Sequence, residues 1–141
     1  MINKNITLEG LQKMYENGDH ISKLLGIEIT EIGADYICGK MPVDSRTVQP
    51  VGILHGGASV VLAESLGSIG GNCCVDFPKQ YCVGLEVNAN HLRSASSGWV
   101  YGKASLVFLG KQTQVWDIRI TNEENKMVCI SRLTLAVKEK I

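Results

Sequence analysis

Residues 55–74 constrain the fold more than any other part of the chain. Apolar side chains recur there at intervals of three and four residues, the spacing that places them on one face of an α-helix. Glycines in the same segment lower its intrinsic helix propensity, so tertiary packing must hold the helix. Their missing side chains also permit a sheet or a second helix to approach closely. The apolar positions are Ala58, Val61, Leu62, Leu66 and Ile69, and the glycines are Gly56, Gly57, Gly67, Gly70 and Gly71.

Strand patterns lie on both sides of this helix. Before it, apolar residues alternate from Ile27, pass the turn-prone Gly33-Ala34-Asp35 and continue to Pro42, which predicts a hairpin followed by a loop over residues 41–50. After it, strand-like stretches occupy residues 81–92, 98–109, 112–121 and 127–137, separated by polar or glycine-containing turns. We expect these four strands to pair as an antiparallel meander.

The element order predicts one α+β domain over residues 1–141, with one sheet and one principal helix. Residues 1–25 form a helical lead-in, in which Thr7 can cap a short helix and Gly18 can stop it. The length and the hydrophobic content of 45% suit a single core. We find no internal repeat, low-complexity region or interdomain linker.

The charge balance excludes several classes of partner. Fourteen basic residues offset fourteen acidic ones, so no long-range field gathers nucleic acid or an anionic membrane surface. Residues 1–7 lack the apolar stretch of a secretory signal, and no later apolar run reaches transmembrane length. The sequence therefore predicts a cytoplasmic protein that binds neither nucleic acid nor membranes.

The cysteines do not indicate a metal site. They form an odd set without the spacing of metal ligands, and the adjacent pair suits neither zinc nor an ordinary disulfide. We expect reduced, mostly buried thiols that act as small apolar residues. The set consists of Cys38, Cys73, Cys74, Cys82 and Cys129.

The chain resembles the hotdog-fold thioesterases of the phenylacetate and hydroxybenzoyl-CoA type over nearly its whole length from residue 26. The resemblance rests on MPVDSRTVQP at 41–50, LHGGASVVLAES at 54–65, VGLEVNANHLRS at 83–94, QVWDI at 114–118 and SRLT at 131–134. Within this group the chain is most similar to bacterial thioesterases that act on 1,4-dihydroxy-2-naphthoyl-CoA in menaquinone synthesis, and to the proofreading enzymes of enterobactin-type siderophore synthesis, which act on aryl acyl-carrier proteins.

The resemblance implies an antiparallel sheet wrapped around one long central helix, the hotdog fold. It also implies a homodimer whose sheets join edge to edge, commonly assembled further into a homotetramer. The implied activity is hydrolysis of an acyl-CoA thioester without any cofactor, because coenzyme A is part of the substrate.

Two residues of the predicted helix are candidates for the chemistry. Thioester hydrolysis needs a nucleophile or base at the carbonyl carbon and hydrogen-bond donors for the negative oxygen that develops. Glu64 lies in an otherwise apolar stretch, and the resemblance implies that it attacks the carbonyl or activates water. Gly56 begins the helix with an unpaired backbone amide at the positive end of the dipole. From the residues alone, two other interpretations stay open: Glu64 could be a solvated glutamate, and the glycine pair that begins at Gly56 could serve only tight packing.

Helical geometry separates these two candidates. Glu64 follows His55 by nine residues, about 900° of rotation and roughly 13 Å along the axis, so the two side chains point to opposite faces. If both act on one thioester, the Glu64 face must meet the His55-Gly56 turn of another subunit. The dimer is then the minimal active unit.

Three further residues have candidate roles near the reacting carbonyl. Ser68 lies one turn after Glu64 and could bond the carboxylate, position water, or only permit close packing. Gln49 matches a family position that the resemblance assigns to orienting the thioester or the water. His55 could donate to the thioester region or brace the loop.

Substrate binding is expected where the long strand after the helix ends. His91, Arg93 and Ser94 stand together there and could hold the phosphates of coenzyme A, or could be a solvated strand end. The resemblance adds Lys111 to these contacts and places Gly84 along the pantetheine tunnel.

Two other functions are possible on the same fold. A non-catalytic acyl-CoA-binding hotdog module should lack the acidic residue, and a hotdog dehydratase or hydratase should pair a histidine with an acid. The combination of Gln49, His55-Gly56-Gly57 and Glu64 fits hydrolysis better. An aromatic acyl group is preferred by resemblance only, and the thiol carrier can be coenzyme A or protein-bound phosphopantetheine.

Overall fold

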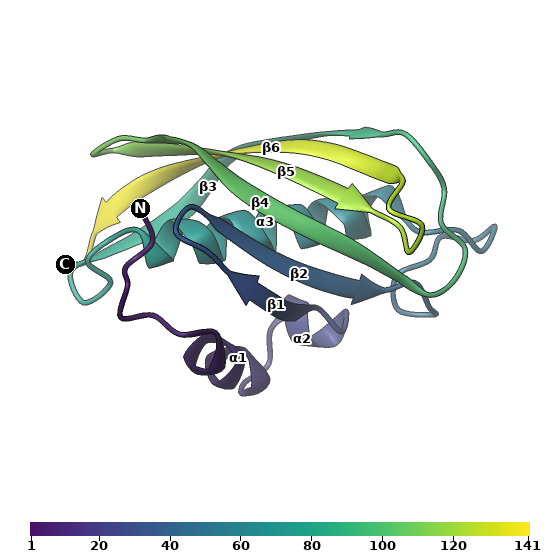
Figure 1. Ribbon diagram of the computed structural model, residues 1–141, viewed down its shortest axis with the longest axis horizontal. Helices are drawn as coiled ribbons and strands as arrows, with labels where there is room; N and C mark the ends of the chain where they lie inside the picture. Colours follow the sequence, from purple (N-terminus) through teal and green to yellow (C-terminus); the bar gives the residue numbers. More distant parts are fainter.

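The computed structural model describes residues 1–141 and shows an antiparallel sheet curled around a long helix (Figure 1). Two short helices lie on the lower side in that view. This is the predicted α+β architecture. The elements in chain order are α1 (Leu8–Glu16), α2 (Ile21–Leu24), β1 (Glu28–Ile32), β2 (Tyr36–Pro42), α3 (Gly56–Cys73), β3 (Gln80–His91), β4 (Trp99–Leu109), β5 (Thr113–Thr121) and β6 (Met127–Glu139).

Helix α3 is held by the sheet, as its glycines predict. A Cβ on Gly70 would lie 2.7 Å from the ring of Trp116, and a Cβ on Gly67 would lie 2.6 Å from Leu133. Substituting Gly70 would therefore push the helix away from the rigid ring of Trp116, and substituting Gly67 would displace the Leu133 side chain. The close approach lets the large side chains of β5 and β6 pack directly against the backbone of α3.

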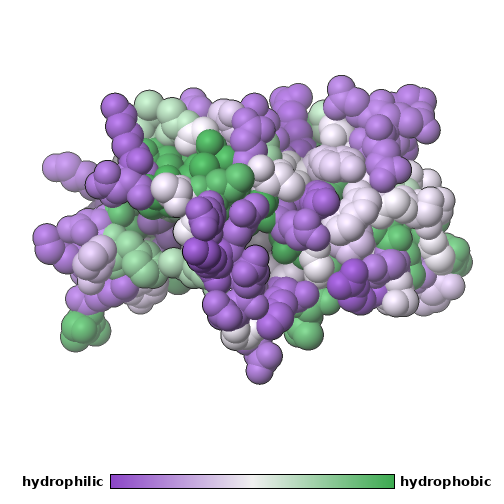
Figure 2. All heavy atoms as spheres, turned by 60° about the horizontal axis from the view of Figure 1, so that its bottom comes forward, coloured by the Kyte–Doolittle hydropathy of each residue, from purple (hydrophilic) through white to green (hydrophobic).

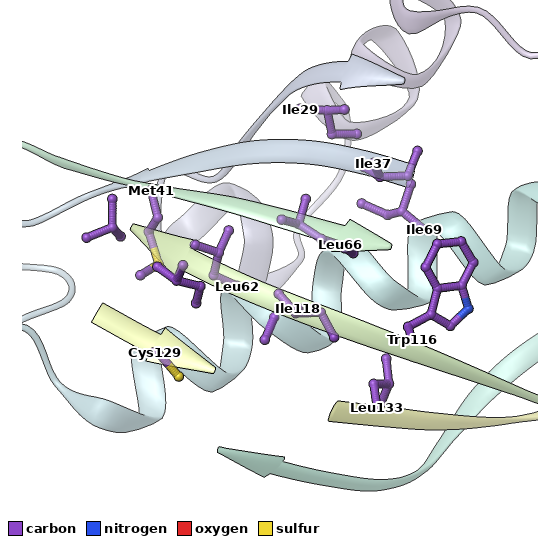
Figure 3. Close-up of a cluster of buried hydrophobic side chains, with 14 of the residues drawn as sticks. Ile29, Ile37, Met41, Leu62, Leu66, Ile69, Trp116, Ile118, Cys129 and Leu133 are labelled. Atoms are coloured by element: carbon purple, nitrogen blue, oxygen red, sulfur yellow. The ribbon is translucent and has the colours of Figure 1, made fainter. Parts of the chain in front are cut away.

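The core fills the space between α3 and the concave face of the sheet (Figure 3). Leu62 and Leu66 of α3, Trp116 and Ile118 of β5, and Leu133 of β6 are completely buried. Each such side chain contributes about 1.5–3 kcal/mol relative to exposure. This burial offsets the poor helix propensity of α3.

The predicted meander of four strands is wrong. The sheet order is β1-β2-β4-β5-β6-β3, so only β4, β5 and β6 form a meander, while β3 pairs antiparallel with β6. The β1–β2 hairpin occupies the edge of β4 that β3 would have used. Residues 92–98 join β3 to β4 across the end of the sheet. An extended segment of that length spans about 23 Å, more than the roughly 14 Å of three strand spacings.

Strand β3 is thus an edge strand, and it carries a bulge. Gly84 pairs with Leu135 and Glu86 with Thr134, so Leu85 is the extra residue. Its side chain is 61% exposed. A long exposed edge with unpaired backbone groups is a template for pairing with another strand.

The predicted short helix of the lead-in is α1, whereas α2 was not predicted. Thr7 caps α1 by accepting a hydrogen bond from the Gly10 amide, and Gly18 follows the helix with φ of 84°. No helix is long and apolar enough to cross a membrane. The face in Figure 2 is mostly hydrophilic, with smaller areas of exposed hydrophobic residues.

All five cysteines are free, and three of them are buried: Cys73, Cys82 and Cys129. Burial raises the pKa of the Cys73 thiol to about 12 and that of the Cys82 thiol to about 11. Because the thiolate is the reactive form, these groups are inert apolar residues at neutral pH.

Candidate active site

A cavity of about 400 Å³ lies at the N-terminal end of α3 and brings together predicted site residues from three parts of the chain. Gln49 comes from the loop after β2, Gly56 begins the helix, and His91, Arg93 and Ser94 come from the end of β3 and the segment after it. Five of the predicted site residues therefore line one cavity. Its other walls are Ile53, Leu54, Ser59, Leu92 and Val128.

The start of α3 presents a free backbone donor to this cavity. His55 is the N-cap, and its Nδ1 accepts a hydrogen bond from the Gly57 amide at 2.8 Å. Gly56, as the first helical residue, has no acceptor within the helix, and the helix dipole makes this end positive. A Cβ on Gly56 would lie 2.9 Å from Nε2 of His91, so glycine keeps the space open. This arrangement can stabilise a negatively charged oxygen.

The cap also defines what His55 does in this chain. Its Nδ1 is the acceptor, so a neutral ring carries its proton on Nε2. The contact that the ring makes within the chain is this cap at the start of α3; neither of the two predicted roles, donating to the thioester region and bracing the loop, follows from it alone.

Gln49 has a fixed orientation. Its Oε1 accepts a hydrogen bond from the Val51 amide at 2.6 Å, and its backbone N–H donates to the Ile53 carbonyl at 2.9 Å. With the oxygen occupied, the side-chain NH₂ is the group left to act in the cavity. Gln49 can therefore donate to a carbonyl oxygen or to a water molecule.

The polar end of the cavity is partly engaged within the chain. Nη1 of Arg93 donates to the Met127 carbonyl at 2.8 Å, which anchors the guanidinium beside the turn between β5 and β6. The other guanidinium N–H groups stay available, and His91 and Ser94 are exposed next to it. This cluster suits an anionic group such as a phosphate.

Glu64 lies elsewhere on α3, against the bulge of β3. Its Oε1 occupies the space that a Cβ on Gly84 would need. The side chain is half-buried, and none of the ion pairs of the chain involves it. Ser68, one turn later, accepts a hydrogen bond from Asn72 at its carbonyl, and its hydroxyl makes no hydrogen bond to Glu64. The carboxylate is thus free to act on a ligand.

The two parts of the predicted site are separate within one chain. Gly56 faces His91 and Glu64 faces Gly84, seven residues apart on β3, a path of up to about 23 Å. Glu64 does not line the cavity at the helix start. Lys111 lines a third region, a cavity of about 460 Å³ that it shares with Gln80.

Sequence reasoning missed two buried residues at the helix start. Ser59 is 1% exposed and lines the cavity, and Thr47 is 2% exposed and accepts the His55 N–H at its carbonyl. Neither residue stands in a pattern that marks it, because the contacts depend on how the loop folds back on the helix. No group of three or more His, Cys, Asp and Glu side chains is placed to hold a metal ion.

Comparison with known proteins gives a consistent result. Residues 51–129 match the family described as the thioesterase superfamily. The chain is 50% identical to the 1,4-dihydroxy-2-naphthoyl-CoA hydrolase of Escherichia coli K12 over 95% of this chain and 96% of that one. It is 44% identical to the proofreading thioesterase EntH of Cronobacter turicensis over 95% of this chain and 96% of that one. A mutant of thioesterase PA1618 from Pseudomonas aeruginosa superimposes with a TM-score of 0.93 at 50% identity, covering 99% of each chain.

Proposed function

The chain belongs to the thioesterase superfamily and is a thioester hydrolase, and we propose that it hydrolyses an aryl acyl-CoA to the free acid and coenzyme A. The acyl group we favour is 1,4-dihydroxy-2-naphthoyl, because the Escherichia coli relative named for that activity matches 95% of this chain and 96% of its own length. Menaquinone synthesis is the corresponding pathway. The family match favours hydrolysis over a non-catalytic acyl-CoA-binding module and over a dehydratase.

The proposed chemistry uses groups of the chain and no cofactor. A Glu64 oxygen attacks the thioester carbon and expels the coenzyme A thiolate, leaving a mixed anhydride that water hydrolyses; alternatively, Glu64 takes a proton from a water that attacks directly. In both routes the carbonyl oxygen becomes negative, and the Gly56 N–H donates to it. Gln49 orients the carbonyl or the water through its free NH₂ group.

The observation that carries this proposal is the separation of Glu64 from Gly56 along an open edge strand. A second copy of the chain can join them if its β3 pairs antiparallel with this β3. Five residues of β3 face the helix and must meet helix-facing residues of the partner: Cys82, Gly84, Val87, Ala89 and His91.

Only certain registers satisfy this condition. A two-fold axis at Asn88 pairs Asn88 with its own copy and Val87 with Ala89 of the partner subunit. Because the bulge at Leu85 adds one residue, Gly84 then lies opposite His91 of the partner subunit. Axes at Val87 or Ala89 place Gly84 away from that histidine. The Asn88 register therefore brings Glu64 to the Gly56 turn of the partner and makes two composite sites.

The N-terminal end of β3 supports this register. Asn72 Oδ1 accepts the Cys82 N–H at 2.9 Å, so this backbone donor is already used within the chain. Pairing about Asn88 ends at Gly84, opposite the last residue of the partner's β3, so it does not need the Cys82 donor. The same register puts the Lys111 end of one subunit beside Arg93 of the partner subunit, where both cations can reach the nucleotide.

Exposed apolar residues on the sheet, among them Phe108, are the surface we propose for assembly of two dimers into a tetramer.

Thiol release from aryl, short-chain and long-chain acyl-CoAs tests the activity. We expect turnover of aryl acyl-CoA, and a loss of about a hundredfold or more in kcat for Glu64→Ala and Glu64→Gln, which remove the nucleophile or base. Equal turnover by wild type and both variants would rule out Glu64 as the catalytic carboxylate.

Cross-linking tests the register. In the Asn88 register, Asn88→Cys places two thiols directly opposite each other, at a Cα separation of about 4.5–5.5 Å that fits a disulfide. Oxidation should give a covalent dimer, whereas Glu86→Cys, about 13 Å from its own copy, should stay monomeric on a denaturing gel. The reverse pattern, or no cross-link with Asn88→Cys, would exclude this register.

A further inference from the structure

We propose that Thr47 is a positioning residue for catalysis, which sets the placement of Gln49 relative to the start of α3. This inference rests on the proposed function, since it concerns the rate of that reaction. Thr47 touches no substrate in this scheme. It acts through Gln49, by holding the segment that carries this orienting amide against the segment that begins α3.

The hydroxyl of Thr47 is buried and fully used. Oγ1 donates to the Pro42 carbonyl at 2.7 Å and accepts the Asp44 N–H at 3.1 Å. The Thr47 N–H donates to the Asp44 carbonyl at 2.9 Å. Because the residue is 2% exposed, water cannot replace these partners if the hydroxyl is removed. Thr47 is thus fixed to the end of β2, which is anchored in the sheet.

The other side of Thr47 reaches the helix start. Its carbonyl accepts the His55 N–H at 2.8 Å, and His55 is the residue that caps α3. The next residue, Val48, forms an antiparallel bridge with Leu54. Gln49 follows and donates its N–H to the Ile53 carbonyl. Thr47 therefore begins a small ladder that holds Gln49 on one side and the Gly56 turn on the other.

A salt bridge close to Thr47 contributes less to this arrangement. Arg46 binds Asp44 with an Nη2–Oδ2 distance of 2.7 Å, and its hydrogen bonds hold the pKa of the Asp44 carboxyl below its ordinary value. Both side chains reach the solvent, with exposed fractions of 47% for Arg46 and 38% for Asp44, and solvent-accessible ion pairs contribute little to stability. The buried hydroxyl of Thr47 is the group that fixes the loop.

The test compares Thr47→Val, which keeps the shape and removes the hydroxyl, with Thr47→Ser, which keeps the hydroxyl. We expect kcat on an aryl acyl-CoA to fall by about ten- to a hundredfold in Thr47→Val with little change in KM, because small misplacements of catalytic groups lower the rate steeply. Thr47→Ser should keep kcat within a few-fold of wild type. If Thr47→Val does not fold, Thr47→Ala against Thr47→Ser isolates the hydroxyl in the same way.

A second measurement separates positioning from stability. In a Gln49→Ala background, Thr47→Val should lower kcat by a much smaller factor than it does in the wild-type background, since the residue through which it acts is already gone. Rates are normalised to the folded fraction from circular dichroism. The proposal would be overturned if the kcat losses of the two single variants multiplied in the double variant. It would also be overturned if Thr47→Val lowered Tm and left kcat unchanged. Wild-type and Glu64→Ala rates measured alongside report on the proposed function separately, so its failure is not confused with this one.

Discussion

Replacing Gly84 by alanine should inactivate the enzyme without destabilising it. A Cβ at this position would meet Oε1 of Glu64, while it would lie 3.5 Å from Cδ of Glu64 and 3.9 Å from Cδ1 of Leu133, both ordinary contacts. The new methyl group thus conflicts with one atom, at the far end of a flexible side chain. The backbone need not move.

The size of the effect follows from this geometry. Oε1 must retreat by about 1 Å to reach an ordinary van der Waals separation, and a misplacement of that size costs about a hundredfold in rate. Stability should change in the opposite direction, because a compatible Gly→Ala change lowers the entropy of the unfolded chain and stabilises by about 0.4–1 kcal/mol. We therefore expect kcat to fall while Tm is unchanged or slightly higher.

The assay is steady-state thiol release, combined with thermal unfolding followed by circular dichroism. Val83→Ala is the matched control, because Val83 is the neighbouring residue on β3 but its side chain is 40% exposed on the other face. It should keep kcat within a few-fold of wild type. A Gly84→Ala protein with wild-type kcat would refute the reasoning that Glu64 must lie against this glycine to act.

Three further predictions concern the helix start, the core and the thiols. Gly56→Pro removes the proposed oxyanion N–H at a position where proline is tolerated, because His55 before it is already extended with ψ of 130°. The kcat of Gly56→Pro should be about 10²–10³-fold below that of Gly56→Ala, which keeps the N–H. Equal kinetics of the two variants would argue against this donor. Leu66→Ala should lower the free energy of unfolding by about 2–5 kcal/mol in urea titrations, because the side chain is completely buried. The thiols of Cys73 and Cys82 keep their protons at pH values above the ordinary thiol pKa of 9.0, so the native state binds more protons than the unfolded state there. The free energy of unfolding should therefore fall as the pH rises from 9.0 towards about 12. A flat profile of Tm against pH over this range would contradict this prediction.

Local patterns predicted the elements because each pattern is set by its own residues. The glycine-rich apolar periodicity gave α3 nearly to the residue, with His55 as cap rather than as first helical residue. Alternation gave all six strands, and Thr7 gave the start of α1. These signals depend on side chains within a few positions of each other.

Strand partners could not be predicted in the same way. Strand β3 pairs with β6 because the β1–β2 hairpin occupies the other edge of β4. That arrangement depends on contacts between residues distant in sequence. The bulge at Leu85 likewise has no local signature, although it controls which residues face Glu64.

Sequence patterns could predict one part of the candidate site, while another part depends on contacts between residues distant in sequence. The helical phase of Glu64 and His55 indicated two separate places, and the structure puts Glu64 and Gly56 at different points along β3. The support by Thr47 depends on a folded loop and was therefore missed.

Subunit complementation tests the shared active site most directly. One chain carries Glu64→Gln and a second, differently tagged chain carries Gly56→Pro; both are co-expressed, and the heterodimer is isolated through both tags. In a composite site, one of the two sites of this heterodimer combines an intact Glu64 with an intact Gly56, so it should recover half of the wild-type turnover per dimer while each mutant homodimer stays inactive. A proven heterodimer with no more activity than the mutant homodimers would show that each site is built within a single chain.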